Sequence, residues 1–374
     1  MASDQSAKRL KTSTDAEKFL EESYFRSYAS TAVHAEMIYD TVRTNSYRLA
    51  ILRSSDQIIG KVVADVGTGT GILSCFCVQA GAKRVYAIEA SDIASAAEEV
   101  VRHNKFEDKI KIIRGKVEEV ELPEKVDVIV SEWMGYCLLF ESMLKSVIYT
   151  RDKWLVDGGI ILPNMASIYL APITCTSADY GGDSGDEDDI KWADPKTHDG
   201  IGCLLQDETD LWNSVKSYYG VDMSCMVKFS RENFLQKAQV HFVEGSQVLA
   251  HPYKIADIDI SKVTLSELAE VSGTFNFRCF GQSKVHGFVG WFSVSFPCKN
   301  KVIIDTSPFH PLTHWQQTVF YLDKDEDVEQ DTLISGDIVI KPNKCERYLD
   351  FILKYSFAGN NPTSKTYLMD DAPE

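Results

Sequence analysis

The sequence predicts an α/β domain followed by an all-β domain. Its 374 residues suffice for two domains of ordinary size. Up to residue 162, short apolar segments alternate with segments of helical periodicity, as in folds with a parallel sheet. From Pro163 onward, apolar positions recur about every second residue, and Gly, Pro and Asp separate the segments. We therefore expect an α/β domain over residues 16–162 and a β-barrel or sandwich over residues 163–374.

The composition is that of a soluble globular protein with a strong negative charge. Hydrophobic residues make up 44% and charged residues 25% of the chain, and the formal net charge is −16. This charge argues against nucleic-acid binding, which needs a basic surface, and suits a basic protein partner. From net charge alone, solubility is the simpler explanation.

The cysteines and the N-terminal residues favour a reducing, intracellular environment. The nine cysteines form no CxxC pair, so we expect reduced thiols and no metal site. The sequence has no apolar signal segment and no run of about 18 apolar residues, so we expect no membrane segment. Residues 1–15 are polar and predict a disordered tail. The basic cluster Lys8, Arg9 and Lys11 in this tail favours the nucleus, with the cytoplasm as a second location.

Residues 16–51 have helical periodicity, interrupted by the segment Tyr24–Tyr28 (YFRSY). Its two tyrosines, the nearby His34 and several charged side chains fit a lid over a polar site. A plain amphipathic helix fits the periodicity equally well.

A strand, a glycine-rich turn, a helix and a second strand follow. Lys61–Val66 predicts a buried strand, Gly67–Gly71 the turn, Ile72–Ala80 an apolar helix and Arg84–Ala90 the next strand. This order is the first half of a nucleotide-binding α/β fold, which is Rossmann-like in its strand–turn–helix–strand arrangement.

The spacing of the glycines indicates which nucleotide-like ligand the turn accepts. Gly67 and Gly69 let the backbone approach a ligand, and Glu89 at the end of the second strand is placed to bind ribose hydroxyls. A dinucleotide pattern would need glycine where Ile72 stands. A GxGxG turn preceded by Asp65 is more typical of folds that bind S-adenosylmethionine. A turn that serves packing alone is the alternative.

Further strands are predicted to bring acidic residues to the same edge of the sheet. Ala94–Asn104 predicts a helix, and Lys109–Val117 and Lys125–Trp133 predict strands. In open α/β sheets, ligands lie beyond the carboxyl ends of the strands. We therefore expect convergence of the four acids that end or follow strands: Asp65, Glu89, Glu118 and Glu132.

The segment Ser131–Met143 (SEWMGYCLLFESM), here called the double-glutamate loop, carries Glu132 and Glu141 in an apolar and aromatic run. Burying a bare carboxylate costs several kcal/mol or more, so this run requires a cation. The turn at Gly135 and Tyr136 would let the two carboxylates face each other. A helix over residues 143–155, a turn at Val156–Gly159 and a strand over 160–173 broken by Pro163 are expected to follow.

The second domain contains two segments that differ from its alternating strands. Ser177–Asp189 is acidic and glycine-rich, and we expect it to be a mobile loop. Asp210–Tyr219 predicts a short helix with large aromatic residues, which fits a subunit contact or docking on its own domain. Near the end of the chain, the turn Pro311–Trp315 carries His314, which is a surface histidine unless it reaches the acidic edge.

Several motifs, in this order along the chain, resemble the type I protein arginine methyltransferases. They are YFRSY, VADVGTGTG, AIEAS, GKVEEVELP, the double-glutamate loop and THW at 313–315. The resemblance extends from about Tyr24 to Tyr367. Segments such as GFVGWFSVSFP and SPFHPLTHW resemble the class-6 branch of the family most, and the loop of the first domain also resembles class 1.

The resemblance implies a layout and a role for each matching residue. An N-terminal helix covers a Rossmann-like S-adenosylmethionine domain, and a β-barrel with a helical dimerisation arm near residues 205–222 follows. The implied catalytic residues are Glu132, Glu141, His314 and Asp40. The residues implied or placed at the cofactor are His34, Arg43, Asp65, Gly67, Gly69, Glu89, Glu118 and Met37. The residues implied at the substrate pocket are Tyr24, Tyr28, Met143 and Trp315.

The implied activity is transfer of methyl groups from S-adenosylmethionine to arginine in basic proteins such as histone tails or Gly/Arg-rich proteins. The expected products are monomethylarginine and asymmetric dimethylarginine, the expected assembly is a homodimer, and no metal is expected. Either Glu141 or the His314–Asp40 pair would receive the proton. A non-catalytic S-adenosylmethionine-binding scaffold and a small-molecule methyltransferase are the alternatives. The sequence departs from the family pattern at Ala35, which follows His34, and in the acidic insert 177–189.

Overall fold

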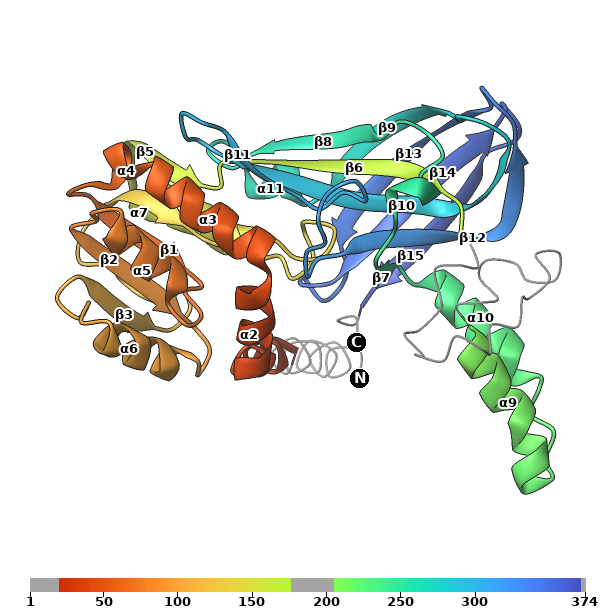
Figure 1. Cartoon of the computed structure of the whole chain (residues 1–374), viewed down its shortest axis with the longest axis horizontal. Coiled ribbons are helices and arrows are strands. Elements are labelled where there is room, and N and C mark those ends of the chain that lie inside the picture. The colour runs from red at the N-terminus through yellow and green to blue at the C-terminus, as the bar shows by residue number, and fades with distance from the viewer. Residues whose placement is uncertain (1–19, 176–204, 371–374) are drawn as a thin grey trace, which may run out of the picture.

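The computed structural model of the chain describes residues 20–175 and 205–370 (Figure 1). The predicted disordered tail and the acidic insert 177–189 lie outside these residues. In Figure 1 the α/β domain is at the left, the β domain is at the upper right, and two helices project from the β domain at the lower right.

The N-terminal segment is a series of short helices rather than one interrupted helix. Residues 20–27 are helical, and α2 (Thr31–Tyr39), α3 (Thr41–Arg53) and α4 (Ser55–Ile58) follow. Asp40 separates α2 from α3, and its Oδ1 accepts a hydrogen bond from the backbone N–H of Arg43. An aspartate that caps a new helix satisfies an otherwise orphaned N–H group, which explains the break that periodicity did not predict.

The first sheet is parallel and has the strand order β3-β2-β1-β4-β5. The strand bounds are β1 (Val62–Val66), β2 (Arg84–Glu89), β3 (Ile110–Arg114), β4 (Val126–Val130) and β5 (Leu155–Leu162). The order reverses between β1 and β4, and this switch point is where α/β sheets bind ligands. The glycine-rich turn follows β1 and Glu132 follows β4, so both stand at the switch point.

Helices α5 (Ile72–Gln79), α6 (Ala94–His103) and α7 (Leu144–Trp154) connect these strands. The predicted turn at residues 156–159 is wrong, because these residues lie inside β5. Between the pairs Val126–Leu155 and Val128–Ile160, β5 advances five residues while β4 advances two. The three additional residues (5 − 2 = 3) form an irregularity, and Gly158 in it has φ +76°. The Asp-Gly-Gly sequence thus distorts a strand instead of ending it.

The second domain consists of two antiparallel sheets. The first has the order β7-β12-β10-β6-β8 with β11 added beside β10, and the second has the order β15-β14-β13-β9. The strand bounds are β6 (Met165–Ile173), β7 (Gln239–His241), β8 (Tyr253–Asp259), β9 (Val271–Arg278), β10 (Ser283–Phe296), β11 (Val302–Asp305), β12 (Gln317–Val328), β13 (Leu333–Pro342), β14 (Leu349–Phe357) and β15 (Thr363–Met369). Two short helical turns, η2 (Gly245–Gln247) and α11 (Leu265–Leu268), lie between strands. The chain passes from β5 in the first sheet to β6 in the second at Pro163 and Asn164.

The helices that project from the β domain are α9 (Gln206–Tyr219) and α10 (Met226–Gln236) (Figure 1). The predicted arm near 205–222 therefore continues through a second helix, which packs on the first through Trp212 Nε1, a donor to Ser230 Oγ at 3.0 Å. Large apolar side chains are exposed on this arm, namely Leu211, Tyr218, Tyr219, Val221 and Phe229.

One apolar core runs through both domains, and a smaller cluster lies where the arm joins the β domain. None of the described helices is long and apolar enough to cross a membrane.

Candidate active site

The glycine-rich turn and Glu89 meet at the carboxyl ends of β1 and β2. Glu89 is only 8% exposed; its Oε2 accepts the backbone N–H of Gly69 and its Oε1 accepts that of Ser91, each at 2.8 Å. Gly67 and Gly69 have φ of +70° and +56°. Such positive φ values favour glycine at both positions, and Cε of Met143 lies 2.3 Å from where a Cβ atom on Gly67 would stand.

Asp65 lies beneath the turn and not at its ligand side. The residue is 0% exposed, and its Oδ2 accepts hydroxyl hydrogen bonds from Thr68 and Ser74, each at 2.6 Å. Burial raises the pKa of Asp65 to about 6, against the effect of these hydroxyl groups. Its assignment to the cofactor is therefore corrected: Asp65 supports the turn and presents no surface to a ligand.

The other predicted cofactor residues come from different elements, and among them His34 lies against the turn. His34 of α2 is buried, its Nε2 lies 2.9 Å from the carbonyl oxygen of Tyr28, and its ring lies 3.0 Å from where a Cβ on Gly69 would stand. Glu118 is exposed, and its Oε1 accepts a hydrogen bond from Ser146 at the start of α7 at 2.7 Å. Met37 accepts a hydrogen bond from Arg43 through its carbonyl oxygen.

Glu132 forms an ion pair with Arg43 that the sequence analysis did not predict. Nε and Nη2 of Arg43 lie 3.1 and 3.0 Å from Oε2 of Glu132, and the two side chains are 7% and 8% exposed. Nη1 of Arg43 donates to the carbonyl oxygen of Met37 at 3.2 Å. The predicted catalytic acid and the predicted cofactor residue are thus bound to each other, because α3 places Arg43 over the end of β4.

Glu141 has a different environment, with tyrosines instead of an arginine at its carboxylate. Tyr28 and Tyr24 donate their hydroxyl groups to Oε2 of Glu141 at 2.7 and 3.2 Å. Burial raises the pKa of Glu141; the two tyrosine hydrogen bonds and the charge of Arg347 act to lower it, and Glu132 acts to raise it.

The double-glutamate loop has an unusual backbone. Glu141 has φ +71°, and positive φ is also found at Cys137, Leu138 and Ser142. A Cβ on Gly135 would lie 2.1 Å from the carbonyl oxygen of Phe140, so the loop can close only with glycine there. Such conformations persist where surrounding structure enforces them, and they gather at functional sites.

Asp40 and His314 form the predicted pair. His314 Nδ1 and its backbone N–H lie 2.7 and 3.0 Å from Oδ2 of Asp40. Burial alone would raise the pKa of Asp40, but hydrogen bonds from His314 and Arg43 outweigh it, and this pKa is lowered. Both oxygens of Asp40 are therefore committed, one to the start of α3 and one to His314.

Trp315 does not line a substrate pocket, which corrects its assignment. The side chain is 3% exposed, and its Nε1 donates to the carbonyl oxygen of Met134 in the double-glutamate loop at 2.8 Å. The indole also lies against the His314 ring, with centroids 4.0 Å apart. Trp315 thus supports the loop and the histidine from behind.

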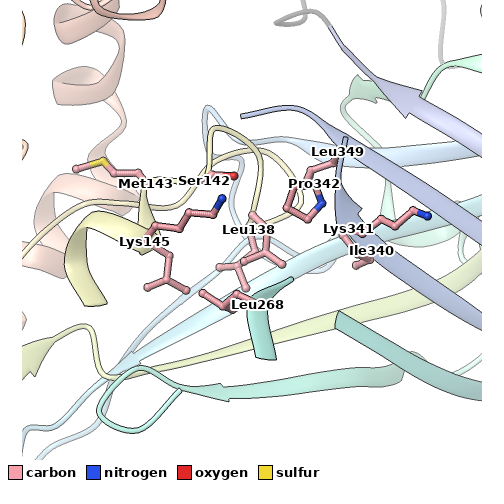
Figure 2. Close-up of a pocket in the computed structure, with 11 residues that line it drawn as sticks. Leu138, Ser142, Met143, Lys145, Leu268, Ile340, Lys341, Pro342 and Leu349 are labelled. Atoms are coloured by element: carbon pink, nitrogen blue, oxygen red, sulfur yellow. The ribbon is translucent and has the colours of Figure 1, made fainter. Parts of the chain in front are cut away.

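Figure 2 shows a small cavity between the double-glutamate loop and the β domain. Leu138, Ser142 and Met143 line it from the loop, and Ile340 and Leu349 line it from β13 and β14. Its volume of about 20 Å³ has room for about one water molecule. The loop is therefore packed on the β domain and not free-standing.

Arg347, between β13 and β14, is the contact that sequence reasoning missed. It hydrogen-bonds the backbone of Glu141, 206 residues away in sequence. No motif in the sequence connects these positions. Among residues 20–175 and 205–370, no group of His, Cys, Asp and Glu is arranged to hold a metal ion.

Two family models match the chain. The model described as the arginine methyltransferase oligomerization subdomain matches residues 202–360, and the one described as ribosomal protein L11 methyltransferase matches residues 42–168. Protein arginine N-methyltransferase 6 of Xenopus tropicalis is 45% identical, over 92% of this chain and 94% of the relative. The Danio rerio protein of the same name is 44% identical, over 99% of this chain and 98% of the relative. The chain belongs to the protein arginine N-methyltransferase family.

Solved structures agree with the fold of this arginine methyltransferase. Arabidopsis thaliana protein arginine methyltransferase 10 is 32% identical with a TM-score of 0.78, covering 93% of this chain and all of that one, 100%. The Trypanosoma brucei PRMT1 enzyme–prozyme heterotetrameric complex with AdoHcy is 34% identical with a TM-score of 0.77, covering 92% and 99%. The predicted family and the α/β plus β fold are confirmed, and α9 and α10 lie within the matched oligomerization subdomain.

Proposed function

We propose that this methyltransferase transfers methyl groups from S-adenosylmethionine to the terminal guanidino nitrogens of arginine in basic proteins. The observation that carries the proposal is which oxygens of the two carboxylates are already hydrogen-bonded by the protein. Oε2 of Glu132 is held by Arg43 and Oε2 of Glu141 by two tyrosines. Among the described residues, Oε1 of Glu132 accepts only the 3.3 Å hydrogen bond from the Met134 N–H, and the side-chain hydrogen bonds of Glu141 all go to Oε2. One oxygen of each acid is left to bind a planar cation.

A guanidinium fits these two oxygens chemically. It is planar and donates through five N–H groups, so it can hydrogen-bond two separate carboxylates at once. Its pKa is above about 12, so it reaches the site as a cation. Two preorganised negative charges in a site shielded from water would offset this charge and orient one terminal nitrogen.

The residues present also fit the methyl donor. Glu89 stands at the end of β2 beside the open glycine turn, where an acid binds ribose hydroxyls. We assign Glu89 to the ribose, Glu118 to the adenine and Arg43 to the carboxylate of the donor. The T. brucei relative is described with AdoHcy, which supports this assignment. When bound, S-adenosylmethionine supplies an electrophilic methyl group.

The proton that leaves the substrate nitrogen goes to Glu141 in this proposal. Burial raises the pKa of Glu141, which makes it a stronger base than an ordinary carboxylate. Asp40 has a lowered pKa, and both of its oxygens are already hydrogen-bonded. His314 and Asp40 are then left to hold α3 and the THW turn in place.

The family resemblance supports the finer parts of the proposal. We infer asymmetric dimethylarginine as the final product and histone tails or Gly/Arg-rich proteins as substrates, which suit the net charge of −16. We also propose a homodimer that buries the exposed apolar side chains of α9 and α10, and a nuclear or partly cytoplasmic location.

The test is transfer of a labelled methyl group from S-adenosylmethionine to a Gly/Arg-rich peptide and to a histone-tail peptide. The same peptides with lysine in place of arginine are the controls, and amino-acid analysis separates asymmetric from symmetric dimethylarginine. Donor binding without product on any peptide would contradict the proposal and favour a scaffold. Competition by a free metabolite but not by peptides would favour a small-molecule substrate.

A further inference from the structure

The turn between β13 and β14 reaches from the β domain to the backbone of Glu141. The N–H of Glu141 donates to the carbonyl oxygen of Arg347 at 2.7 Å, and Nη1 of Arg347 donates to the carbonyl oxygen of Glu141 at 3.0 Å. Arg347 therefore binds both backbone polar groups of Glu141. The carbonyl oxygen of Arg347 binds the N–H of Glu141, and the guanidinium of Arg347 binds its carbonyl oxygen.

The same guanidinium lies against the N-terminal helix. Its Cζ is 3.8 Å from the ring centroid of Tyr24, whose hydroxyl group donates to Oε2 of Glu141. Its Nη2 lies 3.7 Å from Oε1 of Glu21, and Lys116 Nζ lies 2.6 Å from that oxygen. A cation over an aromatic face attracts the ring, so Arg347 holds Tyr24 as well as Glu141.

Glu141 needs such a constraint. Its φ of +71° is a backbone conformation that residues other than glycine and asparagine rarely adopt. Without contacts to hold it, the backbone of Glu141 would relax out of this conformation. The carboxylate would then point in a different direction. The two hydrogen bonds to Arg347 act at the residue where this conformation occurs.

We propose that Arg347 is a positioning residue for methyl transfer: it fixes the backbone of Glu141 and closes the N-terminal helix over it through Tyr24. The β domain then supplies a part of the active-site geometry without contacting the substrate. This inference rests on the proposed function, because it assigns Glu141 a role in that reaction.

A neighbouring side chain in the same turn provides a matched control. Glu346 is 82% exposed in its side chain, which pairs with Lys145 at 3.0 Å. Its carbonyl oxygen accepts from Ser142, and Glu346→Gln leaves this backbone contact in place. The variant therefore changes the charge of the turn without removing the contacts of Arg347.

The charge of Arg347 gives the inference a pH-dependent readout. The ionisable groups that interact with Glu141 through hydrogen bonds or charge lie on three elements. They are Tyr24 and Tyr28 of the N-terminal segment, Glu132 and Tyr136 of the double-glutamate loop, and Arg347 of the β13–β14 turn. Arg347 lowers the pKa of Glu141, which burial raises. Removing this cation raises that pKa further, so the acid limb of the activity profile moves to higher pH. A role in packing alone does not move it.

The experiment compares Arg347→Met, Arg347→Lys and Glu346→Gln in the full chain. Thermal unfolding and binding of S-adenosylhomocysteine check that each variant is folded. With an arginine peptide as substrate, kcat of Arg347→Met is expected to fall on the order of 100-fold, because small misplacement of a catalytic group has this effect. Its KM for the donor stays within a factor of about 2 and its acid limb moves to higher pH. Arg347→Lys keeps the acid limb of the wild type, and Glu346→Gln behaves like the wild type throughout.

Hydrogen exchange separates this inference from the proposed function. Residues 20–28 are expected to exchange faster in Arg347→Met than in the wild type and in Glu346→Gln, whether or not the protein methylates the peptide. Absence of methyl transfer in the wild type would overturn the proposed function alone. Unchanged exchange together with an unchanged acid limb would overturn the role of Arg347, as would a loss of donor binding that equals the loss of activity.

Discussion

The two glutamates of the double-glutamate loop are nine residues apart (141 − 132 = 9), yet different groups bind their carboxylates. Glu132 follows a strand of the parallel sheet, and a cation from α3 neutralises it. Glu141 stands in a loop of positive φ, where neutral tyrosine hydroxyls bind its carboxylate and an arginine of the β domain binds its backbone. The first acid is held by α3 of its own domain, and the second by two segments from distant parts of the chain, the N-terminal helix with its following turn and the β13–β14 turn.

This difference divides the chemistry between the acids. Glu132 is paired with the buried Arg43, and in the proposed function its second oxygen binds the substrate guanidinium. Glu141 has a raised pKa because burial disfavours its charged form, so it accepts a proton more readily. In the proposed reaction, the two glutamates therefore take different roles because their neighbours differ.

The largest expected effect is on methyl transfer. Glu132→Gln and Glu141→Gln should each lower kcat by about 10²–10³-fold or more, because each removes a preorganised charge opposite the guanidinium. Initial rates with a labelled donor and an arginine peptide measure this. Glu119→Gln, a change at an exposed acid, is the control and should be near wild type. Wild-type activity in Glu141→Gln would contradict its catalytic assignment.

The free energy of unfolding should differ more between Glu132→Gln and Glu141→Gln than their methyl-transfer activity does. Glu132→Gln leaves Arg43 charged and buried, which costs about 3–5 kcal/mol of unfolding free energy. Glu141→Gln removes a charge that burial already disfavours, so its loss should be about 1 kcal/mol or less. Urea unfolding at pH 7.5 measures both values. Equal losses of unfolding free energy in the two variants would show that burial of Arg43 does not require the charge of Glu132.

The two tyrosines should differ in their effect on Glu141. Tyr28 donates over 2.7 Å and Tyr24 over 3.2 Å, and a hydrogen bond to a charged group contributes about 1.5–3 kcal/mol. Tyr28→Phe should lower kcat about 10-fold or more, and Tyr24→Phe by less. The ratio of kcat values at saturating peptide measures the difference. Tyr39→Phe, at an exposed tyrosine of α2, is the matched control.

The smallest expected effect is on how stability depends on pH, where Glu141 and Asp40 should contribute in opposite directions. The folded pKa of Glu141 is raised, so its contribution to stability is present below pH 4.5 and is lost as the pH rises through that raised pKa. The folded pKa of Asp40 is lowered, so its contribution is present above pH 3.8 and is lost as the pH falls through that lowered pKa.

Urea unfolding between pH 3 and 8 tests this pair. The difference in unfolding free energy between the wild type and Glu141→Gln should fall as pH rises, and that between the wild type and Asp40→Asn should rise. A common slope for both variants would contradict the opposite pKa directions.

Local patterns were sufficient for the parallel sheet and for the Glu132 side of the site. The strand and helix periods predicted β1, β2, α5 and α6 within a few residues, and the glycine spacing placed the turn between β1 and α5. These features depend on neighbours in sequence, so the sequence carries them directly. A residue at the end of a parallel strand is also at the edge where such sheets bind ligands, which explains why Glu89 and Glu132 could be placed at that edge from the sequence.

Contacts between distant segments were not predictable in the same way. Asp65 and Trp315 were assigned to ligands because of their motifs, but the packing of neighbouring elements buries both. The ion pair of Arg43 with Glu132 depends on how α3 packs against the segment that follows β4. The second helix of the arm, α10, lacked a pattern strong enough to extend the prediction beyond residue 222.

The sequence by itself thus determined the fold class and the family, and it selected the two acids that we propose as catalytic, because period, spacing and motif are local. Only the tertiary structure decided that Glu132 has a cation as its partner and Glu141 has tyrosines and Arg347. Burial and charge at a side chain depend on which segments fold against it, and Arg347 is 206 residues from the acid that it holds.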